Sequence, residues 1–203
     1  MYIKICGITN FQDAITISET GVDALGFVFY SGSKRYISPD KANEIIKELP
    51  PFINTVGLFV NEKRENVIDI LHKCPVDILQ FHGDESPEYC SRFNKRIIKA
   101  FRVKNDFSNN VFNSYSVNAF LLDGFTQGEY GGTGVSFDWD IALMSKKFGR
   151  IIIAGGLNPE NIESALRKIN PYGIDVSSGV EIEPGKKNIN KVKEIVKICK
   201  NFF

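Results

Sequence analysis

The chain has 203 residues, and a hydrophobic content of 43% with 12% aromatic residues is enough for a sizeable core in one large domain or two small ones. Lys and Arg total 25 against 24 for Asp and Glu, so the sequence lacks the global basic field that binds nucleic acids or anionic membranes. No apolar run approaches the roughly 20 residues that cross a bilayer. We therefore expect no nucleic-acid partner and no membrane partner, although this balance still allows a local anion site.

The four cysteines are scattered along the chain without the spacing of a metal site, and only two histidines could join them. The cysteines are Cys6, Cys74, Cys90 and Cys199. A chain of this length does not need disulfides, and no secretory leader pattern opens it. We therefore expect no metal, reduced thiols and a cytoplasmic location.

Short runs dense in Ile, Val, Leu or Phe recur along the chain and predict strands. The expected strands cover residues 2–6, 23–29, 53–60, 76–81, 96–103, 118–123, 150–156 and 172–178. Amphipathic stretches between them predict helices over residues 11–20, 39–49, 62–73, 87–94, 107–114, 138–147, 159–169 and 189–201. Capping signals support several of these helices, at Asn10, at Ser38-Pro39 and at Asn158-Pro159.

Alternation of this kind, without a Pro- or Ser-rich linker or a block of charge, is typical of parallel strands connected by helices. We predict an α/β fold, a single (β/α)8 TIM barrel that occupies residues 1–203 as one domain. A doubly wound open sheet is the alternative that the pattern also allows. Active sites of barrels lie where strands run into the following loops, so the functional residues should stand at strand ends.

Two of these strand ends are rich in glycine. Gly155 and Gly156 stand between a strand and a helix in "AGGLNPEN", and Ser178 and Gly179 follow the last strand in "SSGVE". Backbone N–H groups of such loops bind phosphate, and the seventh and eighth loops of a barrel are used in this way. Either motif alone is equally consistent with a tight turn, but the two together favour a phosphate site.

Asp123 ends the sixth strand, just before the longest loop. A carboxylate after four apolar residues would face the barrel mouth, unless it only caps a helix or stabilises the loop. The loop itself, residues 124–137, contains several glycines. It is either a tolerated insertion or a lid that closes over the substrate.

Cys6 lies at the mouth end of the first strand, ahead of the helix that Asn10 caps. The dipole of that helix would favour a thiolate, which matters because an ordinary thiol with a pKa of about 8.5 is mostly protonated at neutral pH. A thiolate opposite a carboxylic acid can act as a base and acid pair; a buried structural cysteine is the alternative. No Ser-His-Asp order, Walker loop or GxGxxG turn competes with this pair.

Arg35 and His82 are further polar residues on loops after strands. Arg35 in "SGSKRYIS" would be solvated surface by itself, but a substrate carboxylate would give its guanidinium a partner. Gln80, His82 and Asp84 close the fourth strand in "LQFHGDE". A neutral histidine there either contacts a ligand or holds a loop, and the sequence leaves both open.

As a set, these stretches resemble a known family, the phosphoribosylanthranilate isomerases of tryptophan biosynthesis. The matching stretches run in the family's order from residue 4 to residue 188: "KICGIT", "ALGFVFYSGSKRYIS", "VGLFVN", "LQFHGDE", "LLDG" with "GGTG" and "FDW", "IAGGLNPENI", and "GIDVSSGVE" with "PGKKN". The resemblance implies a (β/α)8 enzyme without a cofactor. Its reaction is the Amadori rearrangement of a small phosphorylated substrate, N-(5-phosphoribosyl)anthranilate, to 1-(2-carboxyphenylamino)-1-deoxyribulose 5-phosphate.

The resemblance also implies a role for each candidate residue. Cys6 would be the general base and Asp123 the general acid. Arg35 would hold the anthranilate carboxylate. The phosphate would bind to Gly155-Gly156 and Ser178-Gly179, and the remaining polar groups of the substrate would contact His82 and Asp175. The enzyme is expected as a monomer or a homodimer.

Two rival functions remain on the sequence alone. One is a different barrel enzyme that acts on a phosphorylated sugar. An epimerase would need His and Asp side chains as metal ligands. The histidine-pathway isomerase uses two aspartates, and this chain has Cys6 where one of them would stand. The other is a noncatalytic protein that binds a phosphorylated ligand. Such a protein would be expected to lose Cys6 or Asp123 first, and both are present.

Overall fold

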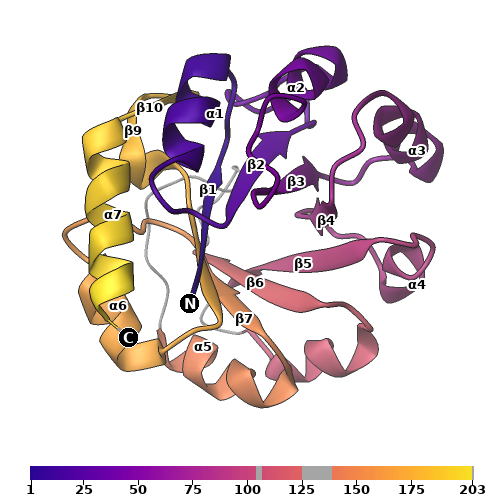
Figure 1. Ribbon diagram of the computed structural model, residues 1–203. Coiled ribbons are helices and arrows are strands. Elements are labelled where there is room, and N and C mark those ends of the chain that lie inside the picture. The colour runs from indigo at the N-terminus through magenta and orange to yellow at the C-terminus, as the bar shows by residue number, and fades with distance from the viewer. Residues whose placement is uncertain (104–106, 125–138, 203) are drawn as a thin grey trace.

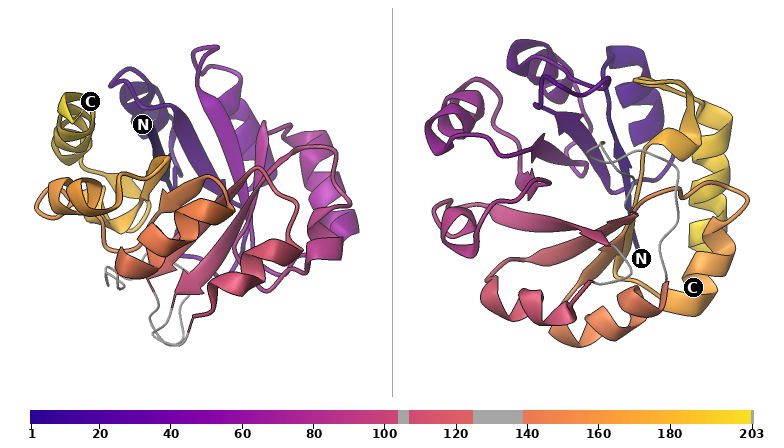
Figure 2. Two further views of the ribbon diagram at one scale, coloured as in Figure 1. Left: turned by 90° about the horizontal axis from the view of Figure 1, so that it is seen from below. Right: turned by 180° about the vertical axis from the view of Figure 1, so that it is seen from behind.

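The computed structural model describes residues 1–103, 107–124 and 139–202. Across these residues eight parallel strands pair in chain order, and the first strand also pairs with the last, which closes the sheet into a barrel. Helices form a ring outside the barrel (Figure 1), and the right view of Figure 2 shows the same ring from behind. The (β/α)8 prediction is confirmed, and the open sheet is wrong because β1 and β8 are hydrogen-bonded neighbours.

The strands follow the predicted apolar runs and are shorter at their ends. Their bounds are β1 Tyr2–Cys6, β2 Ala24–Val28, β3 Asn54–Phe59, β4 Ile78–Phe81, β5 Arg96–Val103, β6 Ala119–Gly124, β7 Ile151–Ile153 and β8 Gly173–Val176. A short antiparallel pair, β9 Glu181–Glu183 and β10 Lys186–Lys187, follows the barrel. This hairpin lies next to the mouth end of β1, since the side chain of Thr9 bonds to the carbonyl of Gly185.

The helices also follow the predicted segments. The α-helices are α1 Phe11–Ser18, α2 Pro39–Ile46, α3 Arg64–Lys73, α4 Pro87–Cys90, α5 Trp139–Ser145, α6 Ile162–Ile169 and α7 Ile189–Asn201, and the 3-10 helices are η1 Asn109–Ser114, η2 Lys146–Phe148 and η3 Ser178–Val180. The side chains of Asn10 and Ser38 cap α1 and α2, as predicted. The predicted start of α6 at Asn158-Pro159 is wrong, because the Asn158 side chain accepts from the N–H groups of the next turn, at Glu160 and Asn161, and the α-helix begins after it.

Side chains of the barrel strands alternate between two environments, as the pleat of a β-strand requires. On β1, Ile3 and Ile5 pack outward into the main core between sheet and helices. Cys6 packs inward in a small cluster with Val28 and Leu58. Lys4 faces inward too, where it pairs with a residue of β8. The site is therefore built from the inward-facing residues near the carboxyl ends of the strands.

The outer layer also contains a buried ion pair, between Lys99 of β5 and Glu85 at 3.0 Å, whose side chains are each 2% exposed. Lys99 Nζ donates to the carbonyl oxygens of Gly83 and Ala100 as well. Glu85 accepts from the backbone N–H groups of Asn61 and Gly83. Every charged atom of this pair thus has a hydrogen-bond partner within the protein.

All four cysteines are buried and free. None of the helices in the described ranges combines the length and the apolar content that a bilayer crossing requires.

Candidate active site

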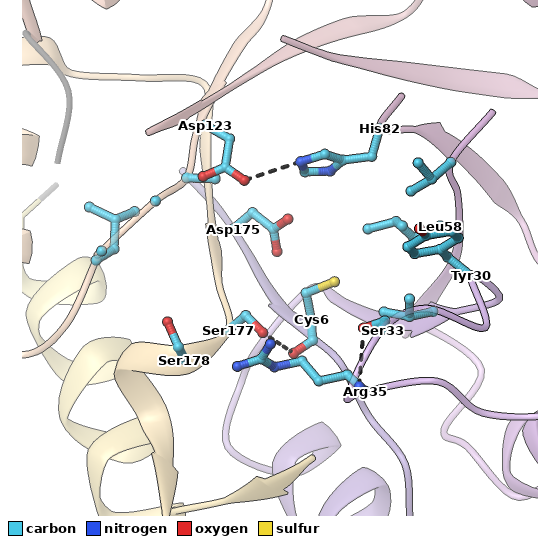
Figure 3. Close-up of a pocket in the computed structure, with 16 residues that line it drawn as sticks. Cys6, Tyr30, Ser33, Arg35, Leu58, His82, Asp123, Asp175, Ser177 and Ser178 are labelled. Atoms are coloured by element: carbon cyan, nitrogen blue, oxygen red, sulfur yellow. Dashed lines mark hydrogen bonds and ion pairs between the residues drawn. The ribbon is translucent and has the colours of Figure 1, made fainter. Parts of the chain in front are cut away.

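A pocket opens at the carboxyl ends of the strands (Figure 3), and most of the predicted site residues line it. Those residues are Cys6, Arg35, His82, Asp123, Gly155, Gly156, Asp175 and Ser178. Gly179 does not line the pocket. A Cβ added at Gly179 would collide with the carbonyl oxygen of Leu157, so this glycine lets the eighth loop approach the seventh.

Cys6 is the last residue of β1 and is 5% exposed. Its carbonyl oxygen accepts hydrogen bonds from Ser177 Oγ at 3.1 Å and Lys187 Nζ at 2.6 Å, which fix the backbone here. Gly26 on the neighbouring strand makes room for the thiol, because a Cβ there would lie 2.7 Å from Cys6 Sγ. The side chain points into the pocket (Figure 3).

Several charges act on the Cys6 thiol. Burial raises its pKa, Lys4 lowers it, and the net direction is upward. This direction contradicts the prediction that the following helix leaves Cys6 as a thiolate. The helix begins only at Phe11, and the Asn10 side chain already accepts from an N–H group of its first turn. The positive charge beside the thiol comes instead from lysine side chains, chiefly Lys4 and more weakly Lys187.

Lys4 is a site residue that sequence reasoning missed. Its Nζ lies 2.7 Å from Asp175 Oδ2, and the two residues face each other across paired strands β1 and β8. Burial lowers the pKa of Lys4, but the negative charge of Asp175 and the neighbouring thiol outweigh it, so the pKa is raised. Asp175 Oδ1 is buried and has no hydrogen-bond partner among the described residues. Asp175 lies between Asp123 and Cys6 in the pocket (Figure 3).

Asp123 of β6 belongs to a hydrogen-bonded chain of three buried side chains. Its Oδ2 lies 3.1 Å from His82 Nε2, and His82 Nδ1 lies 3.0 Å from Gln80 Nε2. Asp123 Oδ1 is buried without a partner in the described part of the chain. The carboxyl group therefore has one oxygen held by the protein and one that can meet a ligand.

Arg35 lies at the pocket wall with its guanidinium fixed by Glu181. Its Nε is 2.9 Å from Glu181 Oε1 and its Nη2 is 2.7 Å from Oε2, a forked pair. Lys187 Nζ also donates to Glu181 Oε1 at 2.7 Å. Burial raises the pKa of the Glu181 carboxyl, but the hydrogen bond from Arg35 and the charge of Lys187 outweigh it and leave the pKa lowered. Gly7 permits this arrangement, because a Cβ there would lie 2.6 Å from Arg35 Cδ.

Gly155 and Gly156 form a turn in which both residues have positive φ, +83° and +65°. The Asn161 side chain holds the Gly156 carbonyl oxygen at 2.8 Å. Among the residues that the structure describes, no hydrogen bond uses the backbone N–H of Gly156 or Ser178. A Cβ at Gly155 would lie 2.7 Å from Asp123 Oδ1 and would also collide with the Gly124 backbone, so this glycine makes room for the carboxyl group as well.

The predicted lid, residues 124–137, lies outside the described residues except for Gly124, which ends β6. Within the described ranges, no group of three or more His, Cys, Asp or Glu side chains could hold a metal ion. The pocket offers the Cys6 thiol, the Asp123 carboxyl group, the lysine-paired carboxylate of Asp175 and backbone N–H groups without a partner among the described residues. Such a set can move protons on a small anionic molecule.

Comparisons with known proteins agree with this geometry. The family profile described as N-(5'phosphoribosyl)anthranilate (PRA) isomerase matches residues 3–198. The N-(5'-phosphoribosyl)anthranilate isomerase of Geotalea uraniireducens is 52% identical over 198 residues, which cover 98% of each chain. The crystal structure of phosphoribosyl anthranilate isomerase from Thermotoga maritima superposes with a TM-score of 0.92 at 42% identity, covering 99% of both chains.

Two further solved structures describe a ligand and an assembly. One is phosphoribosyl anthranilate isomerase in complex with reduced 1-(o-carboxyphenylamino)-1-deoxyribulose 5-phosphate, with a TM-score of 0.89, 40% identity and 99% coverage of both chains. The other describes monomers generated from the dimeric enzyme of Thermotoga maritima, with a TM-score of 0.85, 38% identity and 99% coverage of both chains. With the profile and these relatives covering nearly its whole length, the chain belongs to the N-(5'-phosphoribosyl)anthranilate isomerase family.

Proposed function

We propose that this pocket carries out the Amadori rearrangement of N-(5'-phosphoribosyl)anthranilate in tryptophan biosynthesis, with Cys6 as the general base and Asp123 as the general acid. The family supplies the reaction, and one observation carries the assignment of the two residues. Cys6 at the end of β1 and Asp123 near the end of β6 line a single pocket, with Asp175 between them (Figure 3). Asp123 Oδ1 has no hydrogen-bond partner among the described residues, and the Cys6 side chain points into the pocket.

The reaction needs two proton transfers and no change of oxidation state in the protein. Asp123 gives its proton to the ribose ring oxygen, the bond from that oxygen to C1′ breaks, and the anthranilate nitrogen takes up the positive charge as an iminium. Cys6 then removes the proton on C2′, and the C2′–H electrons form the double bond of an enolamine. Tautomerisation of the enolamine gives the ketone. Positioned proton transfer contributes roughly 10²–10⁴-fold to such a rate, and substrate orientation supplies much of the rest.

Cys6 acts as a base in its thiolate form, which burial disfavours on balance and which the lysines inside the barrel support. Burial works against ionisation, whereas Lys4 and Lys187 lower the pKa of the thiol. Asp175 works against the thiolate, but it also keeps Lys4 in place through the 2.7 Å pair. The lysine and the carboxylate are therefore both part of the base's surroundings, and Asp175 Oδ1 is available to a substrate hydroxyl.

The two anionic groups of the substrate have separate sites in this proposal. Arg35 binds the anthranilate carboxylate, since it lines the pocket and a planar guanidinium matches the geometry of a carboxylate. The phosphate binds between the Gly155-Gly156 turn and the backbone of Ser178. Gly179 supports the second segment by its close approach to Leu157. His82 acts through its hydrogen bond to Asp123.

We infer a cytoplasmic location, which the four free, buried cysteines support, and a single domain over residues 1–203. Both a dimeric enzyme and monomers made from it occur among the related structures, and we expect this chain to be a monomer or a homodimer. A small phosphorylated substrate is its partner, with no cofactor, nucleic acid or membrane.

The test follows the fluorescence of phosphoribosylanthranilate during turnover by wild type and Cys6→Ser. The variant should lose turnover while still binding the reduced product analogue, because a hydroxyl has a far higher pKa than a thiol. The matched control replaces Cys74, Cys90 and Cys199 by alanine. None of these three cysteines lines the pocket, so their removal should leave turnover close to that of the wild type.

Three outcomes would count against the proposal. Near-normal turnover in Cys6→Ser, or inactivity of a well-folded triple variant, would make Cys6 an ordinary buried cysteine. Tight binding of the phosphorylated analogue without turnover by the wild type would favour the noncatalytic alternative.

A further inference from the structure

The hydrogen bond between Gln80 and His82 determines which nitrogen of the imidazole carries a proton. Gln80 is fully buried, and its Nε2 lies 3.0 Å from His82 Nδ1. An amide nitrogen can only donate a hydrogen bond, so Nδ1 must accept one and must be unprotonated. The proton of the neutral ring is then on Nε2, which faces Asp123 Oδ2 at 3.1 Å.

This tautomer determines where the acidic proton of Asp123 is carried. His82 Nε2–H donates to Oδ2, so a protonated Asp123 carries its own proton on Oδ1. Oδ1 has no partner among the described residues, and it lies beside Gly155, where an added Cβ would come within 2.7 Å of it. Gly155 and Asp123 both line the pocket. The proton is thus held on the oxygen that can face a ligand.

The same contact prevents the proton from moving to the histidine. Carboxyl groups next to imidazoles readily form a carboxylate–imidazolium pair, in which the carboxyl group is no longer an acid. An imidazolium at His82 would direct Nδ1–H against the N–H of Gln80, two donors facing each other in a buried site. The structure therefore disfavours transfer from Asp123 to His82.

We propose that Gln80 is a positioning residue that keeps His82 neutral with its proton on Nε2, and thereby keeps Asp123 a proton donor toward the substrate. The inference rests on the proposed role of Asp123. In the step itself, the Asp123 Oδ1–H bond breaks, an O–H bond forms at the ribose ring oxygen, and the carboxylate that remains accepts from His82 Nε2–H. Gln80 and His82 lose no proton.

The orientation of the Gln80 amide supports a functional role for this side chain. It leaves Gln80 Oε1 buried with no partner in the described ranges, which is unfavourable for a polar atom. Turned over, the amide would present Oε1 to the ring and favour a proton on Nδ1. A side chain chosen only for packing would not need an amide at this fully buried position.

The decisive measurement is the ¹⁵N NMR spectrum of the imidazoles in the wild-type protein across its active pH range. The chain has two histidines, and His72 is exposed on α3, so His72→Gln assigns the signals. We expect a pyridine-type Nδ1 and a pyrrole-type Nε2 at His82. A protonated Nδ1 in the free protein would overturn the proposal, whatever the roles of Cys6 and Asp123.

Variants of Gln80 then connect the tautomer to the rate. Gln80→Glu presents an acceptor to Nδ1, so the ring should become doubly protonated and kcat should fall by about 10²-fold, the low end of what a positioned acid contributes. Gln80→Met removes the donor without adding an acceptor, and its kcat should fall less. KM should stay unchanged in both, because Gln80 does not line the pocket.

A purely structural role for Gln80 predicts a different pattern. The variants would then change the free energy of unfolding in urea and leave kcat and the His82 spectrum of the folded protein as in wild type. The experiments also distinguish a failure of this proposal from a failure of the acid assignment. An active Asp123→Asn enzyme would refute the role of Asp123 and would leave the result on the His82 tautomer unchanged.

Discussion

The barrel wall separates two buried lysine–carboxylate pairs that differ in how completely they are bonded. Lys99 and Glu85, outside the sheet, have protein partners for every charged atom. Lys4 and Asp175, inside it, lie closer together at 2.7 Å, yet Asp175 Oδ1 has no partner among the described residues. Burying a charge without partners is costly, so a folded chain retains such an atom where a ligand will use it. The saturated pair stabilises the fold, and the unsaturated pair belongs to the site.

The largest effect should come from Asp123→Asn, which removes the acid and leaves the fold intact. We expect kcat to fall by about 10²–10⁴-fold. The free energy of unfolding should change little, because the asparagine oxygen can still accept from His82 and the lost Oδ1 has no hydrogen-bond partner among the described residues. Turnover by fluorescence and urea unfolding measure the two quantities. A kcat within tenfold of wild type would contradict the assignment.

Replacing the lysine of each ion pair should lower the free energy of unfolding by different amounts. Lys99→Met leaves Glu85 charged in the dry outer layer, so the free energy of unfolding should fall by about 3–5 kcal/mol. Lys4→Met should cost about 1–3 kcal/mol, because water in the pocket can reach Asp175. Urea unfolding of both variants gives the comparison. An equal loss of unfolding free energy in the two variants would show that the different hydrogen bonding of the two pairs does not affect stability.

Arg35→Lys should reduce kcat/KM by roughly 1–3 kcal/mol of transition-state stabilisation, since a lysine cannot reproduce the guanidinium fork. The control is Arg167→Lys, on the exposed pair with Glu163, where no change in kcat/KM is expected. Steady-state kinetics on both variants measure the difference. Wild-type kinetics in Arg35→Met would identify Arg35 as part of the structure around Glu181 only.

The two glycines of the seventh loop should separate binding from catalysis. Gly156→Val should raise KM roughly tenfold or more while lowering kcat less, since the phosphate does not react and a lost hydrogen bond to a charged group has this scale. Gly155→Ala should lower kcat instead, because its Cβ would displace the Asp123 carboxyl group. An unchanged KM in Gly156→Val would remove the phosphate site from this turn.

The smallest effect should appear in the pH dependence of Cys6 alkylation. The thiolate is the reactive form, and Lys4 lowers the pKa of the thiol against the effect of burial. Lys4→Met should therefore raise this pKa further and shift the alkylation curve to higher pH. The measurement uses iodoacetamide on the triple variant without the other cysteines, so that Cys6 alone reacts. A curve that stays in place or shifts to lower pH would mean that Lys4 does not act on the thiol.

The fold could be predicted from the sequence because each strand is a local pattern. Runs such as "RIIIAGG" bury apolar side chains on both faces, and Asn10 and Ser38 mark helix starts by chemistry within three residues. The start of α6 was predicted too early, since the same asparagine chemistry can close a turn before the helix begins. The spacing of apolar residues predicts that a helix or strand exists more reliably than it predicts where that helix or strand begins and ends.

The site could be predicted only in part, because its electrostatics come from residues far apart in sequence. The positions of Cys6 and Asp123 follow from strand ends, but a lysine within a strand is typical of exposed surface, so Lys4 gave no signal. The one available clue was alternation, which places Lys4 on the same face as Cys6. The pKa of the thiol depends chiefly on burial and on Lys4, and only Asp175 and Lys187 act on it from the other end of the chain.

The pairing of β1 with β8 makes the site depend on the meeting of two distant segments of the chain. Lys4 and Asp175 are 171 positions apart, and Cys6 and Lys187 are 181 apart. Contacts of such long range form late, after the intervening strands have been ordered. A chain cut before β8 would therefore lack Asp175 and Lys187, so its Cys6 would have neither the Lys4–Asp175 ion pair beside it nor the closed pocket around it.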